Sequence, residues 1–249
     1  MAKGPFHFKA FSVEQDGAAM KVGTDGIVLG CWTPLREARR ILDVGAGNGY
    51  VGLMLLQRAH PGTELVGVEL EPGAAAQCAA NYENQPFPGH RTSAWQGAIQ
   101  DAAEAHPEWS NHFDLILSNP PFFRDKPKSP IEARNLARHD DTMPMGALAK
   151  AAWSLLKPGG RFCTIWPMDR LDEWEQWGRG VGFQCMQEIH VQTMRHLPPK
   201  RFLSEWIKPG KEGANAVLKA TGQLTLEGSA TLDFTEQYLE IVRPYLRGT

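Results

Sequence analysis

Short apolar runs alternate with longer amphipathic segments along most of the chain. Runs rich in aliphatic residues, bounded by glycine, proline or charged residues, predict strands at 40–44, 64–70, 113–118 and 161–167. Segments rich in alanine, leucine and charged residues predict helices at 50–60, 71–85, 147–156 and 171–180. Because strands and helices alternate, we expect an α/β fold in which a doubly wound, mostly parallel sheet carries helices on both faces.

The C-terminal third departs from this alternation. Strands are predicted at 183–193 and 201–209, and their connection is too short for a parallel crossover, so they form an antiparallel edge pair. In the tail, apolar and polar residues alternate over 224–228, and the residues over 234–246 predict a helix. A short strand within 93–99 and helical segments at 102–106 and 131–139 complete the expected elements.

Composition restricts the possible functions only moderately. The chain has 249 residues, 42% of them apolar, and a formal net charge of −2, so a nucleic-acid surface would have to be a local patch. The start of the chain lacks the apolar run of a signal peptide, and we expect no membrane span and a cytoplasmic location. The four cysteines form no CxxC and the eight histidines no HExxH, so neither disulfides nor a metal site are expected.

A glycine-rich segment, DVGAGNG at 43–49, lies between a predicted strand and a predicted helix, where a ligand can approach the backbone and helix N–H groups. Gly47, Gly49 and Gly52 also spell the G-x-G-x-x-G of dinucleotide sites, and Glu69 ends the next strand, so an NAD site fits this spacing. Asp43 favours another ligand, because a carboxylate there suits an ammonium group or water better than a pyrophosphate. A third alternative is a glycine turn that only packs a helix on a strand.

The segment SNPPFF at 118–123 follows a predicted buried strand. Proline has no backbone N–H, so the segment offers carbonyl oxygens and the Asn119 amide with few donors of its own. This arrangement suits a flat, donor-rich ligand, and a hydride-transferring enzyme has no obvious use for it. The alternative is that the prolines only end the strand while the phenylalanines fill the core.

Taken together, DVGAGNG, VELEP at 68–72 and SNPPFF resemble the class I S-adenosylmethionine-dependent methyltransferases that modify amino groups. The stretches at 8–32, 132–141 and 196–206 are similar to bacterial tRNA1(Val) adenine-37 N6-methyltransferases. The resemblance implies one methyltransferase domain over 1–249 with a seven-stranded Rossmann-like sheet. In it, residues 1–37 close over the cofactor and 38–249 form the core with a C-terminal extension.

The resemblance also assigns roles to residues. A catalytic tetrad would consist of Asn119, Pro120, Pro121 and Phe122, whose ring would stack on a flipped base while the Asn119 amide oxygen and the Pro120 carbonyl accept the hydrogens of its amine. S-adenosylmethionine would be held by Lys21, Thr24, Asp25, Asp43, Gly45, Ala46, Gly47, Gly49, Glu69, Leu70, Ala98, Ile99 and Asn119. Ala98 stands where such enzymes usually carry an acid, so a backbone N–H or Asp101 would have to replace that contact.

Basic residues gather in two stretches. We expect RNA contacts from Arg124, Lys126, Arg134, Arg138, His139, Lys200 and Arg201, the last two within a cluster that also holds Arg195 and His196. Solvated surface is the alternative for any single residue. Trp174 and Trp177, three apart, predict a buried helix stripe rather than a stacking platform.

The expected function is methylation of adenine N6 in tRNA, with tRNA as the macromolecular partner and no obligatory protein partner. Phe122 leaves guanine-N2 methylation of ribosomal RNA open, since related enzymes use Asn-Pro-Pro-Phe. DNA adenine and protein glutamine are weaker alternatives within the same chemistry. An NAD-dependent oxidoreductase and an RNA-binding module with a vestigial cofactor loop lie outside it.

Overall fold

The computed structural model describes residues 4–18, 20–121, 143–210 and 219–248. Within them, eight strands form one sheet in the order β10-β8-β9-β7-β6-β3-β4-β5, and β1 pairs with β2 in a separate hairpin. The strands are β1 Phe6–His7, β2 Ser12–Val13, β3 Arg40–Val44, β4 Glu64–Glu69, β5 Arg91–Gln96, β6 Phe113–Ser118, β7 Leu156–Pro167, β8 Gln184–Met194, β9 Arg201–Ile207 and β10 Ala220–Glu227. The longer helices are α1 Thr24–Trp32, α2 Tyr50–Leu56, α3 Pro72–Glu83, α4 Ala102–Ala105, α6 Met145–Leu155, α7 Leu171–Val181 and α8 Glu236–Val242, with short 3-10 turns at η1 Ile99–Asp101, η2 Pro107–Trp109 and η3 Met168–Arg170.

The order of the parallel strands creates a switch point between β3 and β6. The chain runs outward from β3 through β4 to β5, then returns to place β6 on the other side of β3 and β7 beyond it. In open α/β sheets, ligands bind outside the carboxyl ends of the strands at such a point. The segments that follow β3 and β6 are the glycine loop and Asn119, so the topology brings the two sequence motifs to one edge.

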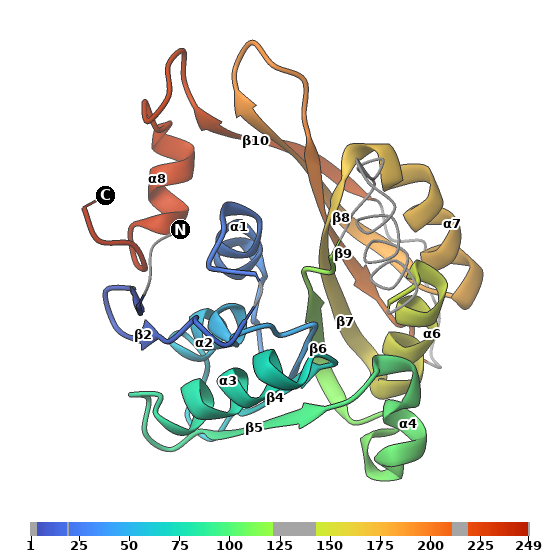
Figure 1. Cartoon of the computed structure of the whole chain (residues 1–249). Helices are drawn as coiled ribbons and strands as arrows, with labels where there is room; N and C mark the ends of the chain where they lie inside the picture. Colours follow the sequence, from blue (N-terminus) through green and yellow to red (C-terminus); the bar gives the residue numbers. More distant parts are fainter. Residues whose placement is uncertain (1–3, 19, 122–142, 211–218, 249) are drawn as a thin grey trace, which may run out of the picture.

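Helices cover both faces of the sheet, as predicted. Figure 1 shows α1, α2, α3 and α8 on one side and α4, α6 and α7 on the other. Successive residues of a strand enter different cores: Ile41 and Leu115 pack with the first group of helices, Leu42 and Ile116 with the second. Because both faces are buried, the central strands read as continuous apolar runs in the sequence.

The C-terminal part of the sheet confirms the antiparallel pair, because β9 runs antiparallel to both β7 and β8. The sheet has eight strands rather than seven, since β10 adds to β8 in parallel. Only the second half of β10 is buried, around Leu224 and Leu226. An apolar signal confined to so few positions is too short to identify a strand whose partner lies far away in the sequence.

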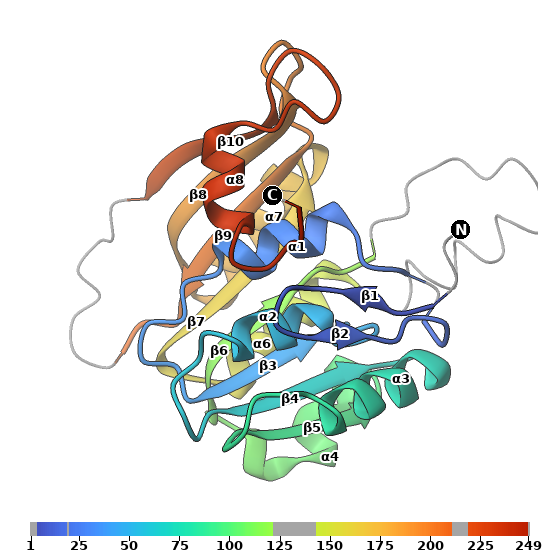
Figure 2. The same ribbon diagram turned by 90° about the vertical axis from the view of Figure 1, so that its left-hand side faces the viewer.

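Helix α1 was not predicted, because its sequence shows only a turn signal followed by a short apolar run. Its buried residues run without a break from Gly26 to Gly30, so no helical periodicity is visible. The helix is enclosed by tertiary neighbours, including α2 and α8. Figure 2 shows the β1–β2 hairpin and α8 on this same side of the molecule.

The two ends of the described chain are joined by hydrogen bonds. The Lys9 backbone N–H donates to the Tyr245 carbonyl at 2.7 Å, and the Arg247 Nε donates to the Phe8 carbonyl at 3.0 Å. The predicted helical segment 131–139 lies outside the described residues. Among the helices described, none has the length and apolar character needed to cross a bilayer.

Candidate active site

The glycine loop links the end of β3 to the start of α2. Gly45, Gly47 and Gly49 have φ angles of +70°, +59° and +82°, in the left-handed region that glycine adopts without steric cost. A Cβ on Gly47 would meet no atom within 4 Å, whereas one on Gly49 would lie 2.6 Å from the Tyr82 ring. Gly47 therefore faces open space, and Gly49 is a packing glycine.

Tyr82 of α3 explains most of the glycine spacing. A Cβ on Gly52 would lie 2.3 Å from the Tyr82 hydroxyl oxygen, and one on Gly67 of β4 would lie 3.1 Å from its ring. The tyrosine is 1% exposed, so three glycines make room for one buried ring. In a dinucleotide site the second glycine of the fingerprint lets the backbone approach the pyrophosphate. Here that side is filled by Tyr82, so the spacing has a packing origin.

Asp43 lies beneath the loop. It is 2% exposed, and its Oδ2 accepts a hydrogen bond from the Gly52 backbone N–H at 2.9 Å, which fixes the first turn of α2 against β3. Burial raises the pKa of Asp43 to about 7; the hydrogen bond from Gly52 opposes this shift, and the nearby charge of Glu69 adds to it. Its direct contact with the cofactor stays a prediction.

Glu69 ends β4 beside the loop and is half-buried. Its carboxylate accepts from the Gly47 N–H at 2.9 Å and from the Glu71 N–H at 3.0 Å. A carboxylate has about four lone-pair sites, so roughly two remain for the hydroxyls of a ligand. Leu70 follows with 39% of its surface exposed, next to the same edge.

The position that lacks the usual acid lies at the end of β5. The Gly97 N–H donates to the Glu69 carbonyl at 3.0 Å, so this turn adjoins the end of β4. Ala98 is half-buried and precedes the 3-10 turn η1, Ile99 is buried as the first residue of that turn, and Asp101 closes the turn and is exposed. The predicted role of the Ala98 and Ile99 backbone stays a prediction.

The Asn-Pro-Pro segment begins where β6 ends. The Ser118 hydroxyl donates to the Val44 carbonyl at 2.8 Å, which ties this segment to the start of the glycine loop. The Asn119 Oδ1 is buried and accepts no hydrogen bond from any described residue. An unpaired buried acceptor costs about 1–3 kcal/mol. Asn119 can therefore receive a donor that the described residues do not supply.

A cavity of about 350 Å³ joins the Asn-Pro-Pro segment to the N-terminal segment. Its lining includes Lys21, Thr24, Asp25, Tyr50, Asn119, Pro120 and Pro121. Residues predicted from two distant stretches of sequence thus share one cavity. Phe122 and the predicted RNA contacts Arg124, Lys126, Arg134, Arg138 and His139 lie outside the described residues.

Comparisons with known proteins agree with this geometry. The family model described as the methyltransferase small domain matches residues 26–168. The chain belongs to this family. It is 44% identical over 200 residues to a tRNA1(Val) (adenine(37)-N6)-methyltransferase from Yersinia pestis, covering 80% of this chain and 79% of the relative. A protein of the same name from Porphyromonas gingivalis is 40% identical over 205 residues, covering 81% of this chain and 80% of the relative.

Solved structures of methyltransferases share the fold. A predicted O-methyltransferase from Agrobacterium tumefaciens aligns over 91% of this chain and all of its own, with a TM-score of 0.68 and 19% identity. A 16S rRNA guanine-N2 methyltransferase from T. thermophilus, solved with AdoMet and guanosine, aligns over 76% of this chain and 44% of its own, with a TM-score of 0.53 and 22% identity. At these identities the likeness establishes the Rossmann-like fold of the methyltransferase.

Tyr50 lines the methyltransferase cavity and was missed in the sequence. The Tyr50 hydroxyl donates to the Gly23 carbonyl at 3.2 Å and so holds the N-terminal segment against α2. Its ring fits because Gly26 has no Cβ, which would lie 1.8 Å from the hydroxyl oxygen. Arg201 donates from Nε to Asp25 Oδ2 at 2.9 Å, and its predicted RNA contact stays a prediction. Only the glycine in TDG could have indicated the Tyr50 contact.

Asn81 of α3 connects the N-terminal segment to the glycine loop of the methyltransferase. Its Nδ2 donates to the carbonyls of Glu14 and Asn48, both at 2.8 Å, and its Oδ1 accepts from the Glu14 N–H at 3.0 Å. The side chain is 6% exposed. Any displacement of the N-terminal segment from the loop would leave this buried amide unpaired, so the two move together.

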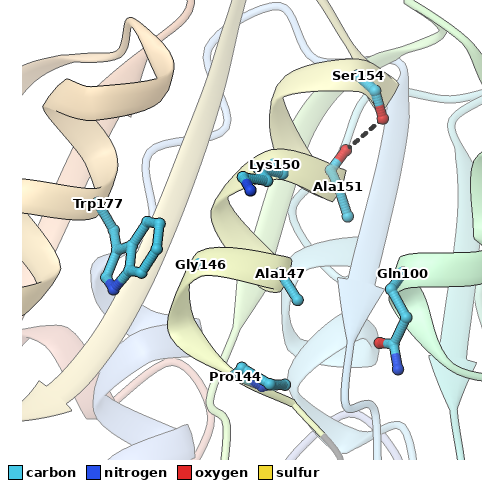
Figure 3. Close-up of a pocket in the computed structure, with 8 residues that line it drawn as sticks. All are labelled: Gln100, Pro144, Gly146, Ala147, Lys150, Ala151, Ser154 and Trp177. Carbon is cyan, nitrogen blue, oxygen red and sulfur yellow. Dashed lines mark hydrogen bonds between the residues drawn. The ribbon is translucent and has the colours of Figure 1, made fainter.

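A second cavity, of about 470 Å³, lies between η1, α6 and α7 and contains none of the predicted site residues. Figure 3 shows Lys150 pointing from α6 toward Trp177 of α7, with Gln100 on the other side of α6. The Lys150 Nζ is 5.9 Å from the Trp177 ring centroid. Trp174 is buried as predicted for a helix stripe, whereas Trp177 is 39% exposed. The cavity at Asn119 is taken as the candidate active site, because its lining includes a residue whose buried acceptor has no partner among the described residues.

Proposed function

We propose that this methyltransferase moves a methyl group from S-adenosylmethionine to the N6 amine of an adenine in tRNA, at position 37 of tRNA1(Val). The observation that carries the proposal is the buried, unpaired Oδ1 of Asn119 in the wall of the cavity. The names of the relatives from Yersinia pestis and Porphyromonas gingivalis support the choice of tRNA and of adenine N6.

The residues around the glycine loop fit S-adenosylmethionine. Gly47 leaves open space above a backbone turn, and Glu69 keeps acceptor capacity for ribose hydroxyls after its two bonds to backbone N–H groups. Leu70 offers an exposed apolar side chain to an adenine ring. Bound there, the cofactor supplies an electrophilic methyl group on its sulfonium sulfur.

The Asn-Pro-Pro segment orients the amine that receives the methyl group. An exocyclic amine on a base is a weak nucleophile because its lone pair is delocalised into the ring. The Asn119 Oδ1 and the Pro120 carbonyl accept its two hydrogens, direct the lone pair, and stabilise the positive charge that grows on nitrogen. The methylated amine is acidic enough to lose its proton late, so no strong general base is required.

The N-terminal segment supplies the remaining wall. Residues 1–37 are proposed to close over the cofactor within one domain spanning 1–249, and Lys21, Thr24 and Asp25 support this role because they line the same cavity as Asn119. Phe122 would stack on the flipped base, a contact worth about 1–3 kcal/mol. The enzyme would act in the cytoplasm, where its tRNA substrate is found.

A nucleoside assay tests the proposal. The protein is incubated with labelled S-adenosylmethionine and RNA from cells that lack the gene, and the RNA is digested and its nucleosides separated. Label in N6-methyladenosine from the tRNA fraction is the expected result. Label in N2-methylguanosine from ribosomal RNA would retain the fold and the role of Asn119 but overturn the substrate. An absence of label in every RNA would overturn the proposal.

A further inference from the structure

The turn between β8 and β9, residues 195–200, lies at the same edge of the sheet as the candidate active site. Arg201 begins β9 opposite Pro167, the last residue of β7, and the Lys200 carbonyl accepts from the Met168 N–H at 3.1 Å. Strand β9 is two strand spacings, about 10 Å, from β6. The turn therefore begins beside the cavity at Asn119 and extends away from it.

The turn carries charge that the described residues do not neutralise. Arg195, His196 and Lys200 are exposed, and their side chains form no ion pair or hydrogen bond with any described residue. Arg170, in the turn that follows β7 at the same edge, is by contrast compensated by Glu173 at 2.9 Å. Uncompensated positive charge concentrated at an active-site edge favours an anionic partner.

A polar groove of about 430 Å³ adjoins the turn between β8, β10 and α8. Three glutamines, two threonines, Arg195 and Glu236 line it, and Glu236 is itself paired with Arg243 at 3.2 Å. The cores of protein–protein interfaces are apolar and rich in aromatic residues. A groove lined only by amides, hydroxyls and charged groups suits a sugar-phosphate backbone instead.

We propose that the turn 195–200 and this groove form a docking surface for the RNA backbone, at which Arg195 and Lys200 each contact a phosphate. The inference rests on the proposed function and adds to it a second contact region, built on the eighth strand. Arg201 differs from these two residues, because its ion pair with Asp25 makes it a positioning residue for the wall of the cavity. The sequence grouped Lys200 and Arg201 together, and the structure separates them.

The shape of the molecule agrees with a contact remote from the target base. Figures 1 and 2 show the β8–β9 turn projecting together with the loop that follows β10. The Arg195 N–H donates to the Gly228 carbonyl at 3.3 Å, so the two loops support each other. Phosphate contacts of this kind set the position of a folded RNA while an unstacked base is read elsewhere.

The test is the salt dependence of tRNA binding by the double variant Arg195→Gln/Lys200→Gln. The slope of log K against log salt should fall by about one for each phosphate that the variant no longer binds. KM for tRNA should rise, while kcat at saturating tRNA and the affinity for S-adenosylhomocysteine stay unchanged. Arg91→Gln is the control for the loss of one charge and is compared with Arg195→Gln alone, because Arg91 is exposed at the amino end of β5, the opposite edge of the sheet.

The outcomes separate this inference from the proposed function. An unchanged salt slope and KM in an enzyme that still forms N6-methyladenosine would overturn the docking surface alone. An equal effect in Arg91→Gln would also overturn it, since the effect would then reflect overall charge. Failure of the wild type to methylate tRNA would contradict the proposed function, whatever its RNA affinity.

Discussion

The two walls of the candidate active site are built in opposite ways. On the glycine-loop side, Asp43 and Glu69 accept hydrogen bonds from backbone N–H groups, and Tyr82 fills the space under the loop. On the Asn-Pro-Pro side, the Asn119 Oδ1 is buried without a partner among the described residues. One wall pairs both of its carboxylates, although the Asn48 Nδ2 and the Tyr82 hydroxyl are also buried there without a partner among the described residues, and the other wall leaves an amide oxygen as an acceptor for a ligand.

We infer from this difference that the glycine-loop side supports the site structurally, whereas the Asn-Pro-Pro side acts on the reacting amine. The carboxylates of Asp43 and Glu69 are already paired and keep their positions when a ligand arrives, so they support the loop as a rigid surface. An unpaired buried acceptor gains a hydrogen bond only when the ligand is present. The free energy of that new hydrogen bond can therefore orient the reacting amine. Substitutions on the loop side should therefore change stability, and substitutions on the Asn-Pro-Pro side should change turnover.

The largest effect is expected for Asn119→Ala. Removal of the acceptor oxygen should lower kcat about 10²-fold or more, by analogy with the removal of one preorganised hydrogen-bonding group from an active site. S-adenosylhomocysteine affinity, measured by calorimetry, should be largely retained. Asn119→Asp keeps an acceptor oxygen at the same place and should retain more activity. Turnover of Asn119→Ala near that of the wild type would contradict the role of this wall.

Phe122 is the last member of the proposed tetrad, and its replacement should have the next largest effect. Phe122→Ala removes the proposed stacking on the flipped base and should reduce kcat/KM for tRNA by an amount equivalent to about 1–3 kcal/mol. Phe122→Tyr keeps the ring and should keep activity. Single-turnover kinetics with tRNA would measure both, and full activity of Phe122→Ala would remove stacking from the mechanism.

Gly52→Ala tests the loop side. The added methyl group would lie 2.3 Å from the Tyr82 hydroxyl oxygen, so overpacking should lower the free energy of unfolding by about 1–3 kcal/mol. Tyr82→Phe in the same chain removes that oxygen and should recover part of the stability. Gly180→Ala is the control, since a Cβ on that helical glycine meets nothing within 4 Å. Urea unfolding measures all three, and a stable Gly52→Ala would refute tight packing here.

An effect that appears only as the pH is changed comes from Asp43, whose pKa is raised by burial to about 7. Between the ordinary pKa near 4 and about 7, the folded state holds a proton that the unfolded state has released, so this group makes stability fall as pH rises, by up to about 1.4 kcal/mol per pH unit. Asp43→Asn removes the titration. Its stability relative to wild type should increase from pH 5 to pH 8 in urea unfolding, and parallel pH profiles would contradict the prediction.

Much of the site could be predicted from the sequence because its signals are local. A strand followed by several glycines, or by Asn-Pro-Pro, can be recognised from a few residues of sequence, and the glycines of the loop do have positive φ angles. The alternation of strands and helices then places the ends of both strands at one edge of a parallel sheet. The resemblance to methyltransferases added Lys21, Thr24 and Asp25, which no local pattern singles out, and the structure places them in the same cavity as Asn119.

Only the tertiary structure decided which side chain the spaced glycines make room for and which charged side chains form ion pairs. Gly49 and Gly52 face Tyr82, which comes from helix α3 beyond the next strand, and Arg201 pairs with Asp25 across 176 positions. Strand β10 pairs with β8, which is not its neighbour in the sequence. Hydrophobic periodicity reports only on which face of an element is buried, whereas these contacts depend on how distant elements meet.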